Sequence, residues 1–372
     1  MVLLTISTRG CTMAAQKTIG ILTSGGDAPG LNAAIRGVAR TAIEQFNMNV
    51  IGIEQGYRGL IQGNAHPLTS EIFPGLLTKG GTILGTSREK PFKKDKNQKY
   101  DLNPVDAIKQ NYDKWNLDAL VVLGGNGTNT TASLLAKEGL NVIGLPKTID
   151  NDIVKTDVTF GFHTAVEVAT DAIDRIHTTA HSHSRIMVVE LMGHKAGWLA
   201  LYAGIAAGGD VILLPEIPYD IQSVANHILM RKESGKNFSI VVVAEGALSV
   251  AESCLEKKAL KKLRQNSNLS IGYQVAKELE KATNLESRVS VLGYLQRGGT
   301  PIAYDRVLAT EMGVEAANMI HKKEFGKMVA LQNEQLVGVP LDEIAGKIKN
   351  VPLNHHLIKA GIDVGTNFGN IL

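Results

Sequence analysis

Two aspartates stand two residues apart in the segment 148–152, which reads Thr-Ile-Asp-Asn-Asp and follows a run of branched apolar residues. One carboxylate of such a pair can take the proton from an attacking hydroxyl, while the other supports it or lies near a metal. A pair of loop aspartates that caps the next helix is the alternative, and it is the commoner case when the segment is taken alone. The basic residue Lys147 beside Asp150 and Asp152 favours phosphoryl-transfer chemistry.

Arginines on several other segments could hold phosphate esters near this pair. Arg88, Arg185, Arg288 and Arg297 lie next to predicted strands or in the loops between them. Each arginine taken singly is more often part of a surface ion pair, but guanidinium groups gathered from several strand ends suit bidentate contacts to phosphate. Their number therefore indicates a phosphorylated ligand.

Two glycine-rich loops follow predicted strands and precede predicted helices. They are TSGGDAPG at 23–30 and GGNGT at 124–128. Glycine lets the backbone approach a phosphate closely, and the following helix points its free N–H groups and its positive dipole end at the anion. A tight strand–helix turn, with Asp27 as a cap in the first loop, is the alternative for each loop alone. The absence of a side chain at Gly127 leaves room for a nucleotide phosphate, and Thr128 is a natural donor in the first helical turn.

Further polar residues at strand ends could orient a sugar phosphate. Glu245 follows the apolar run VVVA and could accept hydrogen bonds from sugar hydroxyls. Tyr294 and Gln296 flank the turn GYLQRGG, in which Arg297 could hold the phosphate. A helix-start or ion-pair role for Glu245 is the alternative.

Short branched runs alternate with helical stretches along the chain, which indicates an α/β fold with mainly parallel sheets covered on both faces. Ligands in such sheets bind beyond the carboxyl ends of the strands. The expected strands are 18–23, 49–54, 119–123, 141–145, 185–191, 211–214, 239–244 and 288–292. The expected helices are 31–46, 130–138, 163–180, 196–207, 221–232, 271–282 and 305–321.

The bulk composition narrows the class of protein further. A chain of 372 residues is long enough for two lobes that share a cleft, and a net charge of only +3 without a cationic tail argues against nucleic-acid or membrane binding. Cys11 and Cys254 have no metal-ligand spacing and indicate a reducing compartment, so a cytoplasmic location is expected. Residues 1–16 are expected to be a loose extension.

Taken together, the loops resemble the 6-phosphofructokinase family from about residue 17 to about residue 306. The resemblance rests on TIGILTSGGDAPGLNAAIRGV, GGTILGTSR, GGNGT, PKTIDND, SHSRIMVVELMG, VAEG and VLGYLQRGGTPIAYDR. It implies two similar three-layer αβα domains with the active site in the cleft between them, and a homotetramer or dimer with shared sites. The expected larger, nucleotide-binding domain comprises 17–160 with about 296–345. The expected smaller, sugar-phosphate domain comprises 161–295 with about 346–372.

The resemblance also implies residue roles. Asp150 is implied as the general base toward the sugar 1-hydroxyl, with Thr148, Asp152, Gly26 and Arg88 as the other catalytic residues. The implied ATP site comprises Gly26, Arg88, Glu89, Gly125, Asn126, Gly127 and Thr128. The implied fructose 6-phosphate site comprises Thr148, Ile149, Asp150, Arg185, Met192, Gly193, His194, Glu245, Arg288, Tyr294, Leu295, Gln296 and Arg297, with one set contributed across a subunit interface. Mg²⁺ is the implied cofactor.

This chain departs from the family pattern at three places. Asn126 replaces the aspartate usual in the metal-holding loop and predicts a weak Mg²⁺ contact. His194 and Tyr294 stand where many members have arginine and histidine. The family's anion effector site is only partly matched, because Arg36 and Arg40 are present while Ser70 and His177 replace basic residues.

Within the resemblance, two positions, 127 and 147, separate ATP from pyrophosphate as the phosphoryl donor. A carboxylate at position 127 would obstruct the nucleotide, and glycine leaves that space open, whereas Lys147 is the residue of pyrophosphate-dependent members. We expect the open space at Gly127 to outweigh the charge of Lys147, so that ATP is the donor. The expected reaction is transfer of the γ-phosphoryl group of MgATP to O1 of fructose 6-phosphate. The alternatives are a pyrophosphate-dependent enzyme and, from another class, a non-catalytic sugar-phosphate-binding regulatory paralog.

Overall fold

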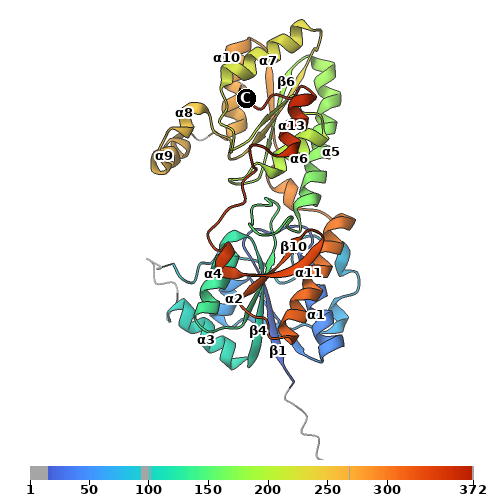
Figure 1. Cartoon of the computed structure of the whole chain (residues 1–372), viewed down its shortest axis with the longest axis vertical. Helices are drawn as coiled ribbons and strands as arrows, with labels where there is room; N and C mark the ends of the chain where they lie inside the picture. Colours follow the sequence, from blue (N-terminus) through green and yellow to red (C-terminus); the bar gives the residue numbers. More distant parts are fainter. Residues whose placement is uncertain (1–15, 94–99, 101, 268, 371–372) are drawn as a thin grey trace, which may run out of the picture.

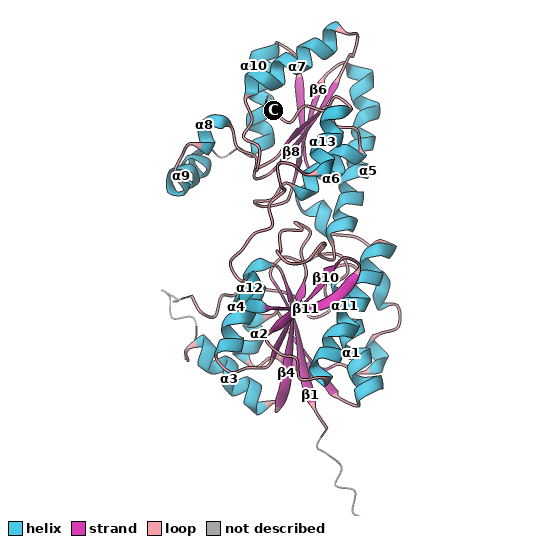
Figure 2. Ribbon diagram, viewed as in Figure 1, coloured by secondary structure: helices cyan, strands magenta, loops and turns pink. Residues whose placement is uncertain are grey.

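The computed structural model describes residues 16–93, 100, 102–267 and 269–370, and it has two lobes, each built on its own sheet (Figure 1). The large lobe contains a seven-stranded sheet in the order β11-β10-β5-β4-β1-β2-β3. The small lobe contains a four-stranded sheet in the order β7-β8-β6-β9. Helices cover both faces of each sheet (Figure 2), as a mainly parallel α/β fold requires.

The large-lobe sheet has seven strands, of which the central β1, β4 and β5 are apolar runs buried along nearly their whole length. The strands are β1 (Thr18–Ser24), β2 (Asn49–Ile53), β3 (Ala65–Pro67), β4 (Leu117–Gly124), β5 (Val142–Pro146), β10 (Lys327–Gln332) and β11 (Gln335–Pro340). The central pairs are parallel, with Ile21 opposite Val121 and Val121 opposite Ile143, while β3 and β11 add antiparallel edges. The carboxyl ends of β1, β4 and β5 therefore lie together at one edge of the sheet.

Helices of the large lobe lie in two layers on the sheet. They are α1 (Leu31–Phe46), α2 (Tyr57–Gln62), α3 (Pro104–Lys114), α4 (Asn126–Lys137), α11 (Ala303–His321) and α12 (Leu341–Ile344), with the 3₁₀ turns η1 (Ser70–Ile72) and η2 (Leu76–Thr78). Helices α1 and α11 lie side by side in Figure 1. Their backbones approach so closely that a Cβ on Gly37 would lie 2.7 Å from the Thr310 carbonyl oxygen.

The small lobe has an all-parallel sheet made of β6 (Ile186–Leu191), β7 (Val211–Leu213), β8 (Ser239–Ala244) and β9 (Ser287–Val291). Its helices are α5 (Phe162–His183), α6 (Trp198–Ala206), α7 (Ile221–Glu233), α8 (Val250–Ser253), α9 (Lys257–Ser267), α10 (Ile271–Thr283) and α13 (His356–Asp363), with η3 (Gly293–Arg297) after β9. Apolar residues of α7 and α10 form one core with one face of the sheet. Helices α8 and α9 project from the lobe (Figure 1).

The predicted α/β class with mainly parallel sheets is confirmed, and each predicted strand and helix corresponds to an observed element. The helix predicted from residue 130 begins earlier, at Asn126, so that GGNGT is the end of a strand and the first turn of a helix. Strands β3, β10 and β11 were not predicted; β3 and β11 are edge strands, where little of the chain is buried and the apolar signal is weak. Within the described residues, no helix is long and apolar enough to cross a membrane.

Candidate active site

A cavity of about 440 Å³ opens at the carboxyl ends of β1, β4 and β5 and reaches the small lobe. This volume is typical of a small-molecule site. It brings together the predicted residues Gly26, Arg88, Glu89, Gly125, Asn126, Gly127, Thr128, Lys147, Thr148, Ile149, Asp150, Asp152, His194 and Arg297. His194 comes from the small lobe and Arg297 from the end of η3, where the chain returns to the large lobe, so the cavity lies between the lobes.

The GGNGT segment forms one wall of the cavity through the start of α4. A Cβ on Gly124 would lie 2.3 Å from Cβ of Thr128, so only glycine allows the strand to turn this tightly into the helix. At Gly127, by contrast, an added Cβ would meet no atom of the described residues within 4 Å. The cavity therefore has open space beside the first N–H groups of α4, which is the feature that an anionic phosphate group uses.

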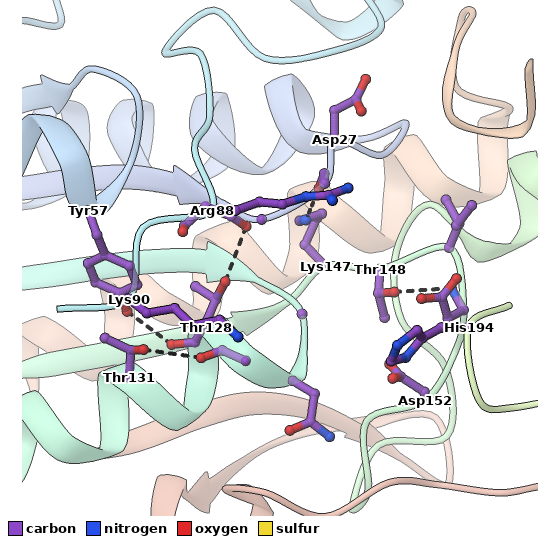
Figure 3. A pocket seen from close by; sticks show the side chains of 18 of the residues that line it. Asp27, Tyr57, Arg88, Lys90, Thr128, Thr131, Lys147, Thr148, Asp152 and His194 are labelled. Atoms are coloured by element: carbon purple, nitrogen blue, oxygen red, sulfur yellow. Dashed lines mark hydrogen bonds between the residues drawn. The ribbon is translucent and has the colours of Figure 1, made fainter. Parts of the chain in front are cut away.

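The first glycine-rich loop forms the facing wall. Gly25 has φ of 89°, a left-handed conformation that favours glycine, and its N–H donates to the Ser87 carbonyl oxygen at 2.9 Å. A Cβ on Gly26 would lie 1.5 Å from an Nη atom of Arg297, so the loop backbone and this guanidinium are in direct contact. Arg88, Asp27 and Lys147 lie along this wall in Figure 3.

Asp150 presents a buried carboxylate to the cavity. Its backbone N–H donates to Oγ1 of Thr148 at 3.1 Å, while its own Oδ1 is buried and has no hydrogen-bond partner among the described residues. Burial and the neighbouring Asp152 raise the pKa of Asp150 to about 6, against the opposing charges of Arg297, His194 and Lys147. A carboxylate with this pKa is ionised at neutral pH and remains a competent base.

Lys147 supplies a buried positive charge between the two glycine-rich loops. Its ammonium donates to the carbonyl oxygen of Gly26, and the residue is only 3 % exposed. Burial, followed by the charge of Arg297, lowers the pKa of Lys147 to about 8, while Asp150 and nearby carboxylates oppose this change. The group is therefore mainly protonated at pH 7 and can stabilise negative charge in the cavity.

Asn126 makes a contact that the sequence does not reveal. Its Nδ2 donates to the carbonyl oxygen of Lys347, in a segment more than two hundred residues further along the chain. The Oδ1 atom lies 3.5 Å from Oγ1 of Thr130 and keeps acceptor capacity for another ligand. The weak Mg²⁺ contact expected for Asn126 stays a prediction, but the residue has this structural contact as well.

A second, smaller cavity of about 160 Å³ lies beyond the carboxyl ends of β6, β8 and β9. Met192, Glu245 and Tyr294 line it, so the structure gathers these predicted sugar-phosphate residues outside the main cavity. Glu245 accepts the backbone N–H of His194 at 2.7 Å, and His194 has a left-handed φ of 53° directly after Gly193. This hydrogen bond links Glu245 of the smaller cavity to His194 of the main cavity.

The η3 turn presents its side chains unevenly. Tyr294 is 75 % exposed and Leu295 is 69 % exposed, whereas Gln296 is fully buried and donates to the Gly293 carbonyl oxygen at 3.2 Å. Nε of Arg297 is buried without a hydrogen-bond partner among the described residues, and its guanidinium lies 6.0 Å from the Tyr294 ring. Arg297 is thus the residue of this turn that reaches the main cavity.

Arg185 and Arg288 do not line either of these two cavities, and their implied role as fructose 6-phosphate ligands stays a prediction. Arg185 precedes β6, and Arg288 is the second residue of β9. In a parallel sheet the amino ends lie at the opposite edge from the carboxyl ends, so both side chains are far from Asp150 in the same chain. Both pair with Glu286, at 2.6 Å for Nε of Arg185.

Several cavity residues were given no role by sequence reasoning. These are Tyr57, Lys90, Thr131, Gly346 and Ile348. Tyr57 is fully buried and donates from its hydroxyl to the Thr128 carbonyl oxygen at 2.9 Å, which fixes the start of α4. The only sequence signal for Tyr57 at the site is its position three residues after the predicted strand 49–54. Gly346 and Ile348 carry no sequence signal, because their segment follows no glycine-rich strand end.

Two glycine-rich strand–helix loops, a buried lysine, and a carboxylate whose pKa is raised toward neutral pH are features typical of a phosphoryl-transfer enzyme. The family model described as Phosphofructokinase matches residues 18–320. The chain belongs to the phosphofructokinase family.

Relatives resemble the chain over nearly its full length. A protein of Spirochaeta thermophila named ATP-dependent 6-phosphofructokinase is 60 % identical over 96 % of this chain and 98 % of its own. A protein of Propionibacterium freudenreichii with the same name is 52 % identical over 95 % and 99 % of the two chains.

Among solved structures, phosphofructokinase of Pichia pastoris in the T-state superposes with a TM-score of 0.78 at 33 % identity, over 95 % of this chain and 37 % of that one. A pyrophosphate-dependent phosphofructokinase of Nitrosospira multiformis has a TM-score of 0.79 at 20 % identity, over 95 % and 93 % of the chains. The latter likeness shows the shared fold alone.

Proposed function

We propose that the protein is an ATP-dependent 6-phosphofructokinase of glycolysis. It transfers the γ-phosphoryl group of MgATP to O1 of D-fructose 6-phosphate and forms fructose 1,6-bisphosphate and ADP. The observation that carries this proposal is the buried Oδ1 of Asp150, which has no hydrogen-bond partner in the described part of the chain and lies in the cavity between the two glycine-rich loops. Relatives named for the ATP-dependent enzyme support it.

Asp150 takes the proton from the sugar 1-hydroxyl as the oxygen attacks the γ-phosphorus. Asp152 lies close enough to raise the pKa of Asp150 and keeps it a stronger base than an ordinary aspartate. Lys147, Arg88 and the first N–H groups of α4 hold the donor phosphates and stabilise their charge. Arg297, His194 and Glu245 orient the sugar phosphate from the small-lobe side.

The residues of the cavity fit Mg²⁺ as cofactor. Magnesium prefers oxygen ligands and often keeps water molecules while it binds substrate phosphates. The Asp152 carboxylate and Oδ1 of Asn126 are such oxygens at the cavity wall, and they would hold the ion together with the donor phosphates. When bound, Mg²⁺ neutralises charge on the phosphate oxygens.

We further propose a homo-oligomer, a tetramer or dimer, in which the arginines at the amino ends of β6 and β9 serve a partner's sugar-phosphate site. Arg185 and Arg288 are separated from the cavity of their own chain yet are held together by Glu286. In this assembly the larger domain comprises 17–160 with about 296–345, and the smaller comprises 161–295 with about 346–372.

The open space at Gly127 favours ATP as the donor, since a nucleotide α-phosphate can lie against the backbone there. A coupled assay with fructose 6-phosphate and either MgATP or Mg-pyrophosphate tests this proposal. Turnover with pyrophosphate alone would reassign the donor.

Lys147 supports pyrophosphate as the second candidate donor, because a cation deep in the cavity can neutralise a small, highly charged donor. A non-catalytic, sugar-phosphate-binding paralog is the remaining alternative, suggested by Asn126 and His194. Tight binding of fructose 6-phosphate in calorimetry, without turnover on either donor, would favour it.

A further inference from the structure

Residues 346–351 form a strap between the two lobes. They leave α12 in the large lobe and lead to α13 in the small lobe, and Figure 1 shows this trace crossing from one lobe to the other. At its start, the N–H of Gly346 donates to Oγ1 of Thr130 at 3.0 Å, and the carbonyl of Lys347 accepts from Asn126. The strap thus begins against the first turns of α4, at the wall of the cavity.

The ammonium of Lys349 is directed into the catalytic loop. Nζ donates to Oδ1 of Asn151 at 2.9 Å, to the Thr156 carbonyl at 2.9 Å and to the Asp157 carbonyl at 3.0 Å. A lysine ammonium has three donors, and here each has an acceptor. The backbone N–H of Lys349 also donates to the Asp152 carbonyl at 2.8 Å.

Asn151 needs this support because of its conformation. It stands between Asp150 and Asp152 with a left-handed φ of 49°, and its side chain is buried. Oδ1 of Asn151 accepts from the Thr159 N–H at 3.1 Å as well as from Lys349. A strained residue persists when its surroundings fix it, so these two donors help to set the direction of both catalytic-loop carboxylates.

The same lysine contacts the small lobe. Its carbonyl oxygen accepts from the indole Nε1 of Trp198 at 2.7 Å, and Nζ lies 5.4 Å from the centre of that ring. Two residues on, the N–H of Val351 donates to Oε1 of Glu216 at 2.9 Å, and Glu216 also accepts from Gly197 at the start of α6. Helix α6 follows the loop that carries His194 into the cavity.

We propose that Lys349 is a positioning residue for phosphoryl transfer, which fixes the segment 148–157 and couples it to the small-lobe residues at the start of α6. This role rests on the proposed kinase function, but Lys349 does not itself touch the reacting atoms. Replacing the Lys349 side chain leaves intact the glycine-rich loops proposed to hold the ATP phosphates. The expected effect is therefore on kcat rather than on the KM for ATP.

The test is Lys349→Met, compared with Lys349→Arg and with the control Lys359→Met on the exposed side of α13. All variants carry Trp115→Phe, which leaves Trp198 as the sole tryptophan of the chain. Steady-state rates are measured with MgATP and fructose 6-phosphate and divided by the folded fraction from circular dichroism. Tryptophan emission is recorded for each variant.

We expect Lys349→Met to lower kcat about 100-fold, the scale of a small misplacement of reacting groups, with the KM for ATP changed less than about threefold. Trp198 emission shifts to longer wavelength as the strap contact loosens. We expect the kcat of Lys349→Arg to be at least about tenfold higher than that of Lys349→Met, because arginine keeps cationic donors. The control Lys359→Met should have the kcat of the parent enzyme.

A change in kcat below about threefold, or a loss fully explained by unfolded protein, would overturn the proposal. Should Lys349→Met not fold, Trp198→Phe gives the second test, because it removes the indole donor while retaining the ammonium and most of the packing. We expect it to lower kcat about tenfold at unchanged KM for ATP, and an unchanged kcat there would also refute the role. Absence of turnover in the parent enzyme would refute the proposed function instead, while the emission shift would still report the strap contact.

Discussion

The rate of the enzyme should fall steeply on mild acidification, because the pKa of Asp150 is raised to about 6 by burial and by Asp152. The ionised carboxylate is the active form of the base, so activity is lost as pH falls through this value. Ionisation is about nine-tenths complete at pH 7 and about one-tenth at pH 5, which gives an expected loss of kcat/KM of about tenfold. An aspartate with an ordinary pKa near 3.8 would lose less than about a tenth over the same range.

The assay is the coupled rate at subsaturating fructose 6-phosphate and saturating MgATP between pH 5 and pH 8. Asp152→Asn removes a negative charge that raises the pKa of Asp150, so its acid limb should lie at lower pH than that of the parent. The phosphate group of the substrate titrates identically with both enzymes, and Asp113→Asn on the exposed side of α3 serves as a control with an unchanged limb. Identical acid limbs for the parent and Asp152→Asn would refute the coupling between the two carboxylates.

Three further predictions follow from the cavity walls and the lobe junction. Gly127→Asp fits without a steric clash in the protein but places a negative charge in the proposed nucleotide space. Because close like charges repel by a few kcal/mol, the substitution should raise the KM for ATP at least about tenfold. An unchanged KM would show that ATP does not bind beside this residue. Asn126→Asp replaces the donor to Lys347 with an acceptor, which should destabilise the fold by about 0.5–1.5 kcal/mol in urea unfolding. The same change should lower the Mg²⁺ concentration for half-maximal rate, and a metal dependence identical to that of the parent would place residue 126 away from the ion. Asp305 of α11 is fully buried and accepts hydrogen bonds from the N–H groups of Gly161 and Thr164 and from the Thr164 hydroxyl, at 2.6–2.9 Å, at the start of α5. Asp305→Ala should therefore lower the free energy of unfolding in urea by about 3–5 kcal/mol. A loss below about 1 kcal/mol would contradict the importance of these hydrogen bonds.

The parallel fold and the main cavity could be predicted from the sequence because both depend on local patterns. Buried parallel strands are continuous apolar runs, and their glycine-rich ends meet at one edge of the sheet by topology. Thus Gly26, Gly127 and Asp150 converge in the structure as expected. Arg185 and Arg288 begin the predicted strands 185–191 and 288–292, and they lie at the amino ends of β6 and β9 as that prediction requires.

The contacts of the strap could not be predicted, since they join segments far apart in the chain. Lys349 and Asn151 are separated by almost two hundred residues, and the lysine lies in a stretch without strong periodicity. Asn126 looked like a lost metal ligand for the same reason, because its partner Lys347 is visible only in the folded chain. Such tertiary hydrogen bonds leave no local pattern.

The most direct measurement of the central claim is the coupled rate with fructose 6-phosphate and MgATP for the parent enzyme and for Asp150→Asn, at pH 7.5 and equal folded concentration. The account predicts turnover by the parent, and a kcat at least about 100-fold lower in the variant with a similar KM for ATP. Turnover by Asp150→Asn within about tenfold of the parent would contradict the assignment of Asp150 as the base.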